Sequence, residues 1–151
     1  MADQATQQTS INASADRCFE VAVDFERYPA WARDVKEAVV ADRDADGRPL
    51  EVAYRAAALG RSIRYRLRYD YSEAPDRLSW ELVDGDIVRR LDGVYEFAEK
   101  GAGAEVTYRL EVDLALPLPN LVKRRAEKLI MHTALGALKR EVERRETEAA
   151  R

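Results

Sequence analysis

From about residue 35 to residue 119 the chain alternates apolar and polar residues with a period of two, which is typical of half-buried β-strands. Turn-forming residues interrupt the alternation at DADGR, Gly60, APD, DGD and EKGAG. Consecutive strands joined by short turns are typical of an antiparallel meander. The pattern predicts strands at about 35–43, 50–59, 61–73, 77–83, 88–98 and 104–119.

A further strand and two short helices are expected ahead of this meander. Residues 6–13 mix polar and β-branched types and favour a first strand. Ser14 is suited to cap the helix that follows, and Tyr28-Pro29 is predicted to end it, because proline disfavours helical geometry in the residue before it. A second short helix that carries Trp31 is expected at about 30–34.

The last segment of the chain predicts one long helix. Asn120 is expected to cap it, and the helical pattern continues to about Arg145. Its inward positions follow helical spacing and are expected to be Val122, Ala126, Leu129, Thr133 and Ala137.

The predicted strands have one apolar face. Between Ile63 and Tyr71 the apolar and aromatic residues alternate with Arg64, Arg66 and Arg68. The long helix is the expected cover of the apolar face. The fold class is therefore predicted to be α+β, with a curved antiparallel sheet of about seven strands wrapped around a long C-terminal helix.

Composition narrows the classes of function. The 151 residues favour one domain, 1–151, with an ordered core at about 5–145. A net charge of -3 argues against a nucleic-acid partner. No apolar run approaches the roughly 20 residues that span a bilayer, so no integral membrane segment and a cytoplasmic location are expected. One cysteine and one histidine permit neither an internal disulfide nor a usual zinc site, and no metal or cofactor is predicted.

One acidic segment resembles a calcium-binding loop at its start. Asp42, Asp44 and Asp46 match the opening positions of an EF-hand, but Ala53 stands where the bidentate carboxylate is needed. The flanking segments are predicted strands and not helices. A plain acidic hairpin is favoured.

Three other features invite a functional interpretation. The ladder Arg64, Arg66 and Arg68 is expected to pair with acidic residues across neighbouring strands, on the outer face. His132 falls on the polar side of the last helix and is expected to be solvated. Cys18 occupies an apolar helical position and is expected to be a small core residue.

The apolar face carries an unusual number of aromatic side chains with polar atoms. Each buried phenol or indole needs a hydrogen-bond partner. Either several of these groups reach water near the ends of the sheet, or some line a wet or ligand-filled cavity. The residues are Tyr54, Tyr65, Tyr69, Tyr71, Trp80, Tyr95 and Tyr108.

The long helix has small residues at or beside its inward positions, namely Thr133, Ala134, Gly136 and Ala137. Small residues let a helix approach a sheet closely, although Gly136 costs about 1 kcal/mol in a helix interior. Alternatively, a strongly curved sheet leaves space that threonine and alanine do not fill. The second interpretation, a pocket between sheet and helix, is favoured.

The order of elements resembles the helix-grip fold of the START-like (SRPBCC) superfamily over about residues 5–145. Several sequence segments resemble its bacterial polyketide cyclase/dehydrase and lipid-transport branch. They are VAVDFERYPAW, LSWEL, LDGVYEF, GAGAEVTYRLEVDLALPLP and KRRAEKLIMHTALGALKREVE. The resemblance implies a cavity for a hydrophobic small molecule. Its expected lining is Tyr54, Tyr65, Tyr69, Trp80, Tyr95 and Tyr108 on the sheet, Leu129, Ile130, Thr133 and Ala137 on the helix, and Trp31 near the mouth.

Three functions are compatible with the sequence and the resemblance. The leading hypothesis is a carrier or sensor that binds a lipid, quinone or polyketide-like molecule. A second is a cyclase or dehydrase that acts in the same cavity, with a tyrosine as general acid. A third is a toxin-like protein-interaction module that uses its surface. No inward Arg, His or carboxylate stands out, so no catalytic residue is assigned.

Overall fold

A computed structural model describes residues 5–58 and 60–150 of the chain. It contains one antiparallel sheet of seven strands, in the order β1-β7-β6-β5-β4-β3-β2. The strands are β1 (Ala5–Ile11), β2 (Val35–Arg43), β3 (Pro49–Ala58), β4 (Arg61–Asp70), β5 (Arg77–Gly85), β6 (Val88–Lys100) and β7 (Gly103–Leu114). The helices are α1 (Ala15–Ala22), the 3-10 helix η1 (Phe25–Arg27), α2 (Tyr28–Trp31) and α3 (Asn120–Ala149).

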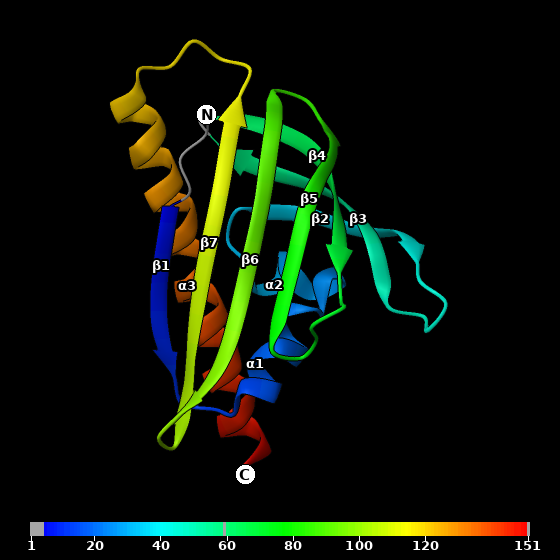
Figure 1. The fold of residues 1–151 in the computed structure, drawn as a ribbon, viewed down its shortest axis with the longest axis vertical. Helices are drawn as coiled ribbons and strands as arrows, with labels where there is room; N and C mark the ends of the chain where they lie inside the picture. Colours follow the sequence, from blue (N-terminus) through cyan, green and yellow to red (C-terminus); the bar gives the residue numbers. More distant parts are fainter. Residues whose placement is uncertain (1–4, 59, 151) are drawn as a thin grey trace.

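The sheet is strongly curved and α3 lies along one half of it. Figure 1 shows β1, β7 and β6 running alongside α3, whereas β2, β3 and β4 turn across the molecule. The helix packs against β1, β7 and α1. Because α3 covers only this half, a cavity remains between the helix and the strands that curve away.

The alternation that predicted the strands is confirmed by their burial. In β4, Ile63, Leu67 and Tyr69 are buried, and Tyr65 is half-buried. A six-stranded meander, β2 to β7, pairs in sequence order, and β1 closes the sheet by pairing with β7. The predicted α+β fold class, with a curved sheet and a long C-terminal helix, is therefore confirmed.

The predicted inward face of α3 is partly wrong. The residues that pack into the core are Met131, Leu135, Leu138 and Val142, all within 5% of full burial. Leu129, which the spacing placed inward, is 65% exposed. Two overlapping apolar stripes run along this helix, and the one that starts at Met131 faces β1 and β7. Which of the two stripes faces the core depends on how the helix sits on the sheet, and helical spacing alone does not specify this.

Val122 and Ala126 were also predicted to face inward, and they do not pack into the core. Val122 is 41% exposed and Ala126 is half-buried, whereas Ala137 is buried as expected. The helix boundaries also differ from prediction. Pro119 holds the N-cap position without a side-chain hydrogen bond, so Asn120 is the first helical residue and not the cap.

The segment after β1 begins as predicted and then differs. The backbone N–H of Arg17 donates to Oγ of Ser14 over 3.2 Å, which confirms Ser14 as the cap of α1. Pro29 does not end a helix, because it lies in the first turn of α2. In that position its missing N–H has no intrahelical partner to lose. The short helix that carries Trp31 is consequently Tyr28–Trp31 and not 30–34.

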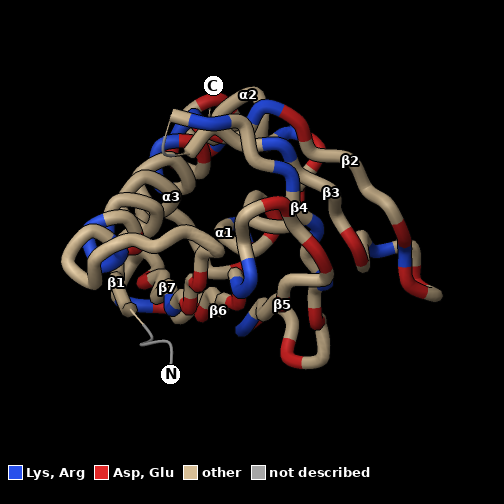
Figure 2. Tube along the Cα trace, turned by 90° about the horizontal axis from the view of Figure 1, so that it is seen from above, with Lys and Arg blue, Asp and Glu red and all other residues tan. Residues whose placement is uncertain are grey.

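The outer face of the sheet is a network of ion pairs. Arg66 contacts Asp84 at 2.9 Å, and Arg68 contacts Glu51 at 3.0 Å. Cross-strand pairing of the arginine ladder is thus confirmed, with partners on β2, β3 and β5. Arg64, for example, contacts Glu37 of β2 at 3.8 Å. Figure 2 shows charges of both signs spread along the strands.

Candidate functional site

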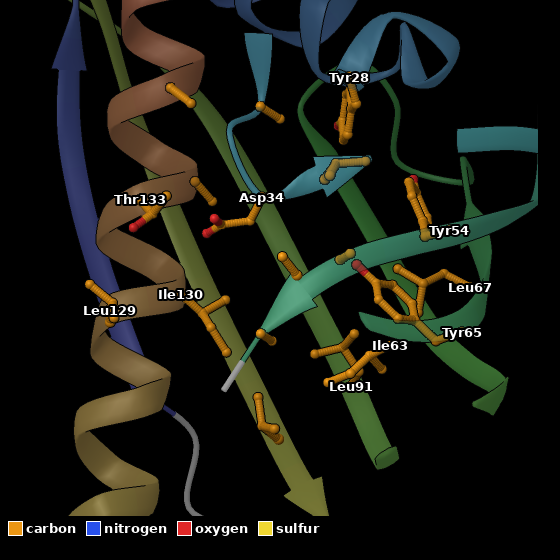
Figure 3. A pocket seen from close by; sticks show the side chains of 18 of the residues that line it. Tyr28, Asp34, Tyr54, Ile63, Tyr65, Leu67, Leu91, Leu129, Ile130 and Thr133 are labelled. Atoms are coloured by element: carbon orange, nitrogen blue, oxygen red, sulfur yellow. The ribbon is translucent and has the colours of Figure 1, made fainter. Parts of the chain in front are cut away.

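A cavity of about 550 Å³ lies between the curved half of the sheet and α3. Its floor is formed by side chains from β3 to β7, one wall by α3, and another by the segment from Tyr28 to Val35. Figure 3 shows Tyr54, Tyr65 and Leu91 on the strands and Thr133 on the helix around this space. A volume of this size lies within the range of small-molecule sites.

Of the aromatic residues on the apolar face, Tyr71 does not line the cavity, and its hydroxyl donates to the carbonyl of Pro49 over 2.5 Å. The structure does bring together the residues that were predicted to line the cavity. All of them line the cavity, including Trp31 of α2 and the exposed Leu129 at the outer edge. They are Trp31, Tyr54, Tyr65, Tyr69, Trp80, Tyr95, Tyr108, Leu129, Ile130, Thr133 and Ala137. Ala134 also lines the cavity, whereas Gly136 does not.

At one end of the cavity, the hydroxyls of two tyrosines form a hydrogen bond with each other. Oη of Tyr54 and Oη of Tyr69 are 2.5 Å apart, and both side chains are buried. The ring of Phe25 stacks on Tyr69 with centroids 4.2 Å apart. Tyr28 donates its hydroxyl hydrogen bond to the carbonyl of Ala22, which ties α2 to the end of α1. These contacts position the aromatic wall without using a ligand.

A second aromatic group lies farther along the sheet. The ring centroid of Trp80 is 5.2 Å from that of Tyr95 and 5.7 Å from that of Tyr108. Among residues 5–58 and 60–150, no hydrogen bond involves the hydroxyls of Tyr95, Tyr108 or Tyr65. These hydroxyls are therefore available to a molecule inside the cavity.

The cavity holds its phenols in the neutral form. Burial raises the pKa of Tyr54, Tyr69 and Tyr108 well above the ordinary value of 10.0. Burial and the nearby carboxylate of Asp34 raise the pKa of Tyr65 to about 12. A low-dielectric site disfavours the phenolate. At neutral pH these groups are consequently hydrogen-bond donors and not bases.

Trp31 contributes another donor to the cavity wall. Its ring packs edge-on against Tyr28, with centroids 4.9 Å apart. The indole Nε1 is covered, and within the described part of the chain it has no hydrogen-bond partner. A covered N–H without a partner costs about 1–3 kcal/mol relative to a paired one.

Charged residues stand at the mouth and not in the interior. Arg33 and Asp34 lead from α2 into β2, and Lys123 and Glu127 belong to the first turns of α3. Asp34 is exposed, and Figure 3 shows its carboxylate directed toward α3, where Thr133 lies. The interior is thus apolar and neutral, while its rim carries both signs of charge.

Sequence reasoning missed part of the lining. The missed apolar residues on the strands belong to the same alternating face as the predicted aromatics. The alternation of apolar and polar residues could therefore have identified them. No sequence pattern indicated Asp34, because it lies between α2 and β2, where no periodicity applies. The additional lining residues include Tyr28, Asp34, Ala56, Ile63, Leu67, Leu78, Val88, Leu91, Val112 and Leu114.

The other candidate residues lie away from the cavity. His132 is exposed, as expected for a solvated histidine. Cys18 is fully buried in the core, as expected, and burial together with Glu99 raises the pKa of its thiol to about 11. A thiol with such a pKa is a poor nucleophile at neutral pH.

The acidic segment after β2 forms a hairpin turn. Oδ1 of Asp44 accepts from the backbone N–H groups of Asp46 and Arg48, both over 2.9 Å. Across residues 5–58 and 60–150, no group of three His, Cys, Asp or Glu side chains is placed to hold a metal ion. Asp44 therefore orders a turn between β2 and β3.

The curved sheet, the long C-terminal helix and the cavity between them define a protein of the START-like, helix-grip class. The family described as polyketide cyclase/dehydrase and lipid transport matches residues 2–143, and the chain belongs to this family. No curated protein matches it in sequence. No helix of the described residues is long and apolar enough to span a membrane.

Solved structures share the fold at low identity. A START superfamily protein from Mycobacterium smegmatis is 22% identical, with a TM-score of 0.88 over 93% of this chain and 97% of that one. TTHA0849 from Thermus thermophilus is 20% identical, with a TM-score of 0.79 over 93% and 97%. The Zhui aromatase/cyclase from Streptomyces sp. R1128 is 16% identical, with a TM-score of 0.80 over 96% of each chain.

Proposed function

We propose that this protein is a cytoplasmic carrier or sensor that binds a neutral hydrophobic small molecule in the cavity between the sheet and α3. One observation carries the proposal. The cavity of about 550 Å³ is walled by aromatic and aliphatic side chains, among them Tyr95 and Tyr108, whose hydroxyls have no protein partners in the described residues. An apolar space with a few unpaired donors suits a mostly apolar guest.

The chemistry of the wall narrows the guest. The neutral phenols and the absence of interior charge among the described lining residues disfavour a buried carboxylate or ammonium, which needs a partner of opposite charge. Carbonyl or ether oxygens can accept from the phenols. Lipids with a neutral polar group, quinones and polyketide-like molecules meet these conditions. Apolar contact contributes about 25 cal/mol for each Å² of apolar surface that is removed from water.

Occupancy of the cavity can be tested with two neighbouring residues of α3. Thr133 lines the cavity, whereas His132 is exposed and does not. Thr133→Trp fills the space, and His132→Trp adds the same group to solvent. Native mass spectrometry of the gently purified proteins is expected to find a bound small molecule in the wild type and in His132→Trp but not in Thr133→Trp. Equal ligand occupancy in the two variants would contradict this site.

A catalytic use of the same cavity is the second candidate. It is favoured by the neutral hydroxyls of Tyr95 and Tyr108, each of which can donate a hydrogen bond to an enclosed carbonyl oxygen and so polarise it. The neighbouring Zhui structure is named an aromatase/cyclase. Turnover of a poly-β-keto thioester should then fall in Tyr95→Phe and Tyr108→Phe. Turnover that is unchanged in both variants, or that is absent from the wild type, removes this candidate and leaves the carrier or sensor.

A further inference from the structure

The N-terminal part of α3 does not take part in the core. Within α3, which is described in full, the buried side chains all come from Met131 or from residues after it. Residues 120–130 thus form three turns of helix without a buried side chain, tied to β1 near their end, where Nε2 of Gln7 donates to the carbonyl of Lys128 over 3.0 Å. Figure 1 shows the first turns of the helix beyond the N-terminal end of β1. Helical structure here leaves one side of the segment uncovered by protein.

That uncovered side is apolar. Val122 and Leu129 are seven residues apart and therefore project in nearly the same direction, with Leu121 and Ile130 on either side of them. Leu121 is 61% exposed and Leu129 is 65% exposed. They are the two most exposed of the large apolar side chains in the described residues. We name Leu121, Val122, Leu129 and Ile130 the apolar stripe.

Basic residues border the apolar stripe. By helical geometry Lys128 lies just beyond Leu121 and Lys123 just beyond Ile130, whereas Arg125 projects between Leu121 and Leu129. Neither Arg125 nor Lys128 has an acidic side-chain partner among the described residues, and both are exposed. Figure 2, viewed from above, shows Lys and Arg on this part of α3. The patch is basic although the whole chain has a net charge of -3.

We propose that the apolar stripe and its basic border form a docking surface for an anionic lipid membrane. An amphipathic helix of this kind lies in the interface, with its apolar side chains among the acyl chains and its Lys and Arg at the headgroups. The long basic side chains reach the headgroups while their aliphatic parts cover apolar surface. A neutral or basic partner would not use the charges that flank the stripe.

Docking would also orient the cavity. Leu129, Ile130 and Lys123 line the mouth as well as the docking surface, so the mouth would face the membrane. The docking proposal goes beyond ligand binding and does not depend on it. It is tested with residues that do not line the cavity.

The test is flotation of the protein with vesicles of phosphatidylcholine alone and of phosphatidylcholine with phosphatidylglycerol. The wild type is expected to bind the second kind, to bind the first weakly, and to be released by salt. The double variant Arg125→Glu, Lys128→Glu should weaken binding about 30-fold or more, since each basic residue near an anionic surface contributes about fivefold. Leu121→Ser should weaken it about tenfold.

The matched control is Arg89→Glu, Arg140→Glu, which changes the net charge equally at exposed positions outside this surface. It should retain binding within about threefold, and all variants should unfold at the wild-type temperature. Failure of the wild type to bind anionic vesicles overturns the proposal, as does an equal loss in the control. A wild-type dimer that Leu121→Ser dissociates, without vesicle binding, would assign the surface to a second copy and overturn it too.

Discussion

The indole ring of Trp80 lies flat against the backbone of β6 at Gly93. The two residues are directly opposite in the β5–β6 register. A Cβ atom on residue 93 would lie 2.3 Å from Cζ2 of Trp80, well inside any real contact distance. The absence of a side chain at Gly93 therefore lets Trp80 lie beside Tyr95 and Tyr108 in the wall of the cavity.

Gly93→Ala is expected to destabilise the protein by about 1–3 kcal/mol, because the added methyl group must displace the Trp80 ring or the strand. The free energy of unfolding in urea measures this loss. Tryptophan fluorescence should report the altered position of the indole. Unchanged stability in this variant would show that Trp80 does not pack on Gly93.

Gly136→Ala is expected to have the opposite effect. Gly136 lies in the interior of α3, and a Cβ there would meet only the end of the flexible Arg140 side chain at 3.3 Å. Alanine should stabilise the helix by about 1 kcal/mol. Because Gly136 does not line the cavity, ligand occupancy in native mass spectrometry should stay at the wild-type level. A loss of stability would indicate that the helix needs glycine for close packing.

The hydrogen bond between Tyr54 and Tyr69 can be tested by removing one hydroxyl at a time. Tyr54→Phe or Tyr69→Phe alone should cost about 1–2 kcal/mol of unfolding free energy, because the remaining hydroxyl loses its partner. The double variant should cost less than the sum of the two single changes. Strict additivity in this cycle would mean that the two hydroxyls do not interact.

Stability should fall at alkaline pH. Tyr54, Tyr69 and Tyr108 have folded-state pKa values raised by burial, while in the unfolded chain they titrate near 10.0. The folded protein therefore binds more protons above that pH, and the stabilisation that is complete below it is lost as pH rises. Each such phenol removes about 1.4 kcal/mol per pH unit.

Cys18 adds to the loss from about pH 9.0, the ordinary pKa of its thiol, because its folded-state pKa is about 11. Urea unfolding at a series of pH values, followed together with tyrosinate absorbance, measures the effect. A free energy of unfolding that stays constant above pH 10.0 would show that the phenols ionise as readily in the folded protein.

The fold and much of the candidate site could be predicted from the sequence because strand alternation is a local property. A residue such as Tyr95 points to the same face as its neighbours two positions away, whatever the rest of the chain does. The same rule identified the aromatic wall. The small side chains of Thr133 and Ala137 then indicated which part of the helix lies over the space.

Features that depend on long-range packing could not be predicted in this way. The choice between the helix side of Leu129 and that of Met131 depends on how α3 sits on β1 and β7. Asp34 reached the cavity mouth through the path of a connecting segment. Pro29 was expected to end a helix, but it is equally suited to the first turn of the next one.

The most direct test of the account is the affinity of a neutral fluorescent probe, Nile red, for the wild type, Thr133→Trp and His132→Trp. If the space beneath α3 admits an apolar guest, the probe binds the wild type and His132→Trp alike. Its affinity then falls about tenfold or more in Thr133→Trp, because the indole occupies the volume that the probe needs. Equal affinity for the two variants, or no binding to the wild type, would contradict the claim that this cavity is the binding site.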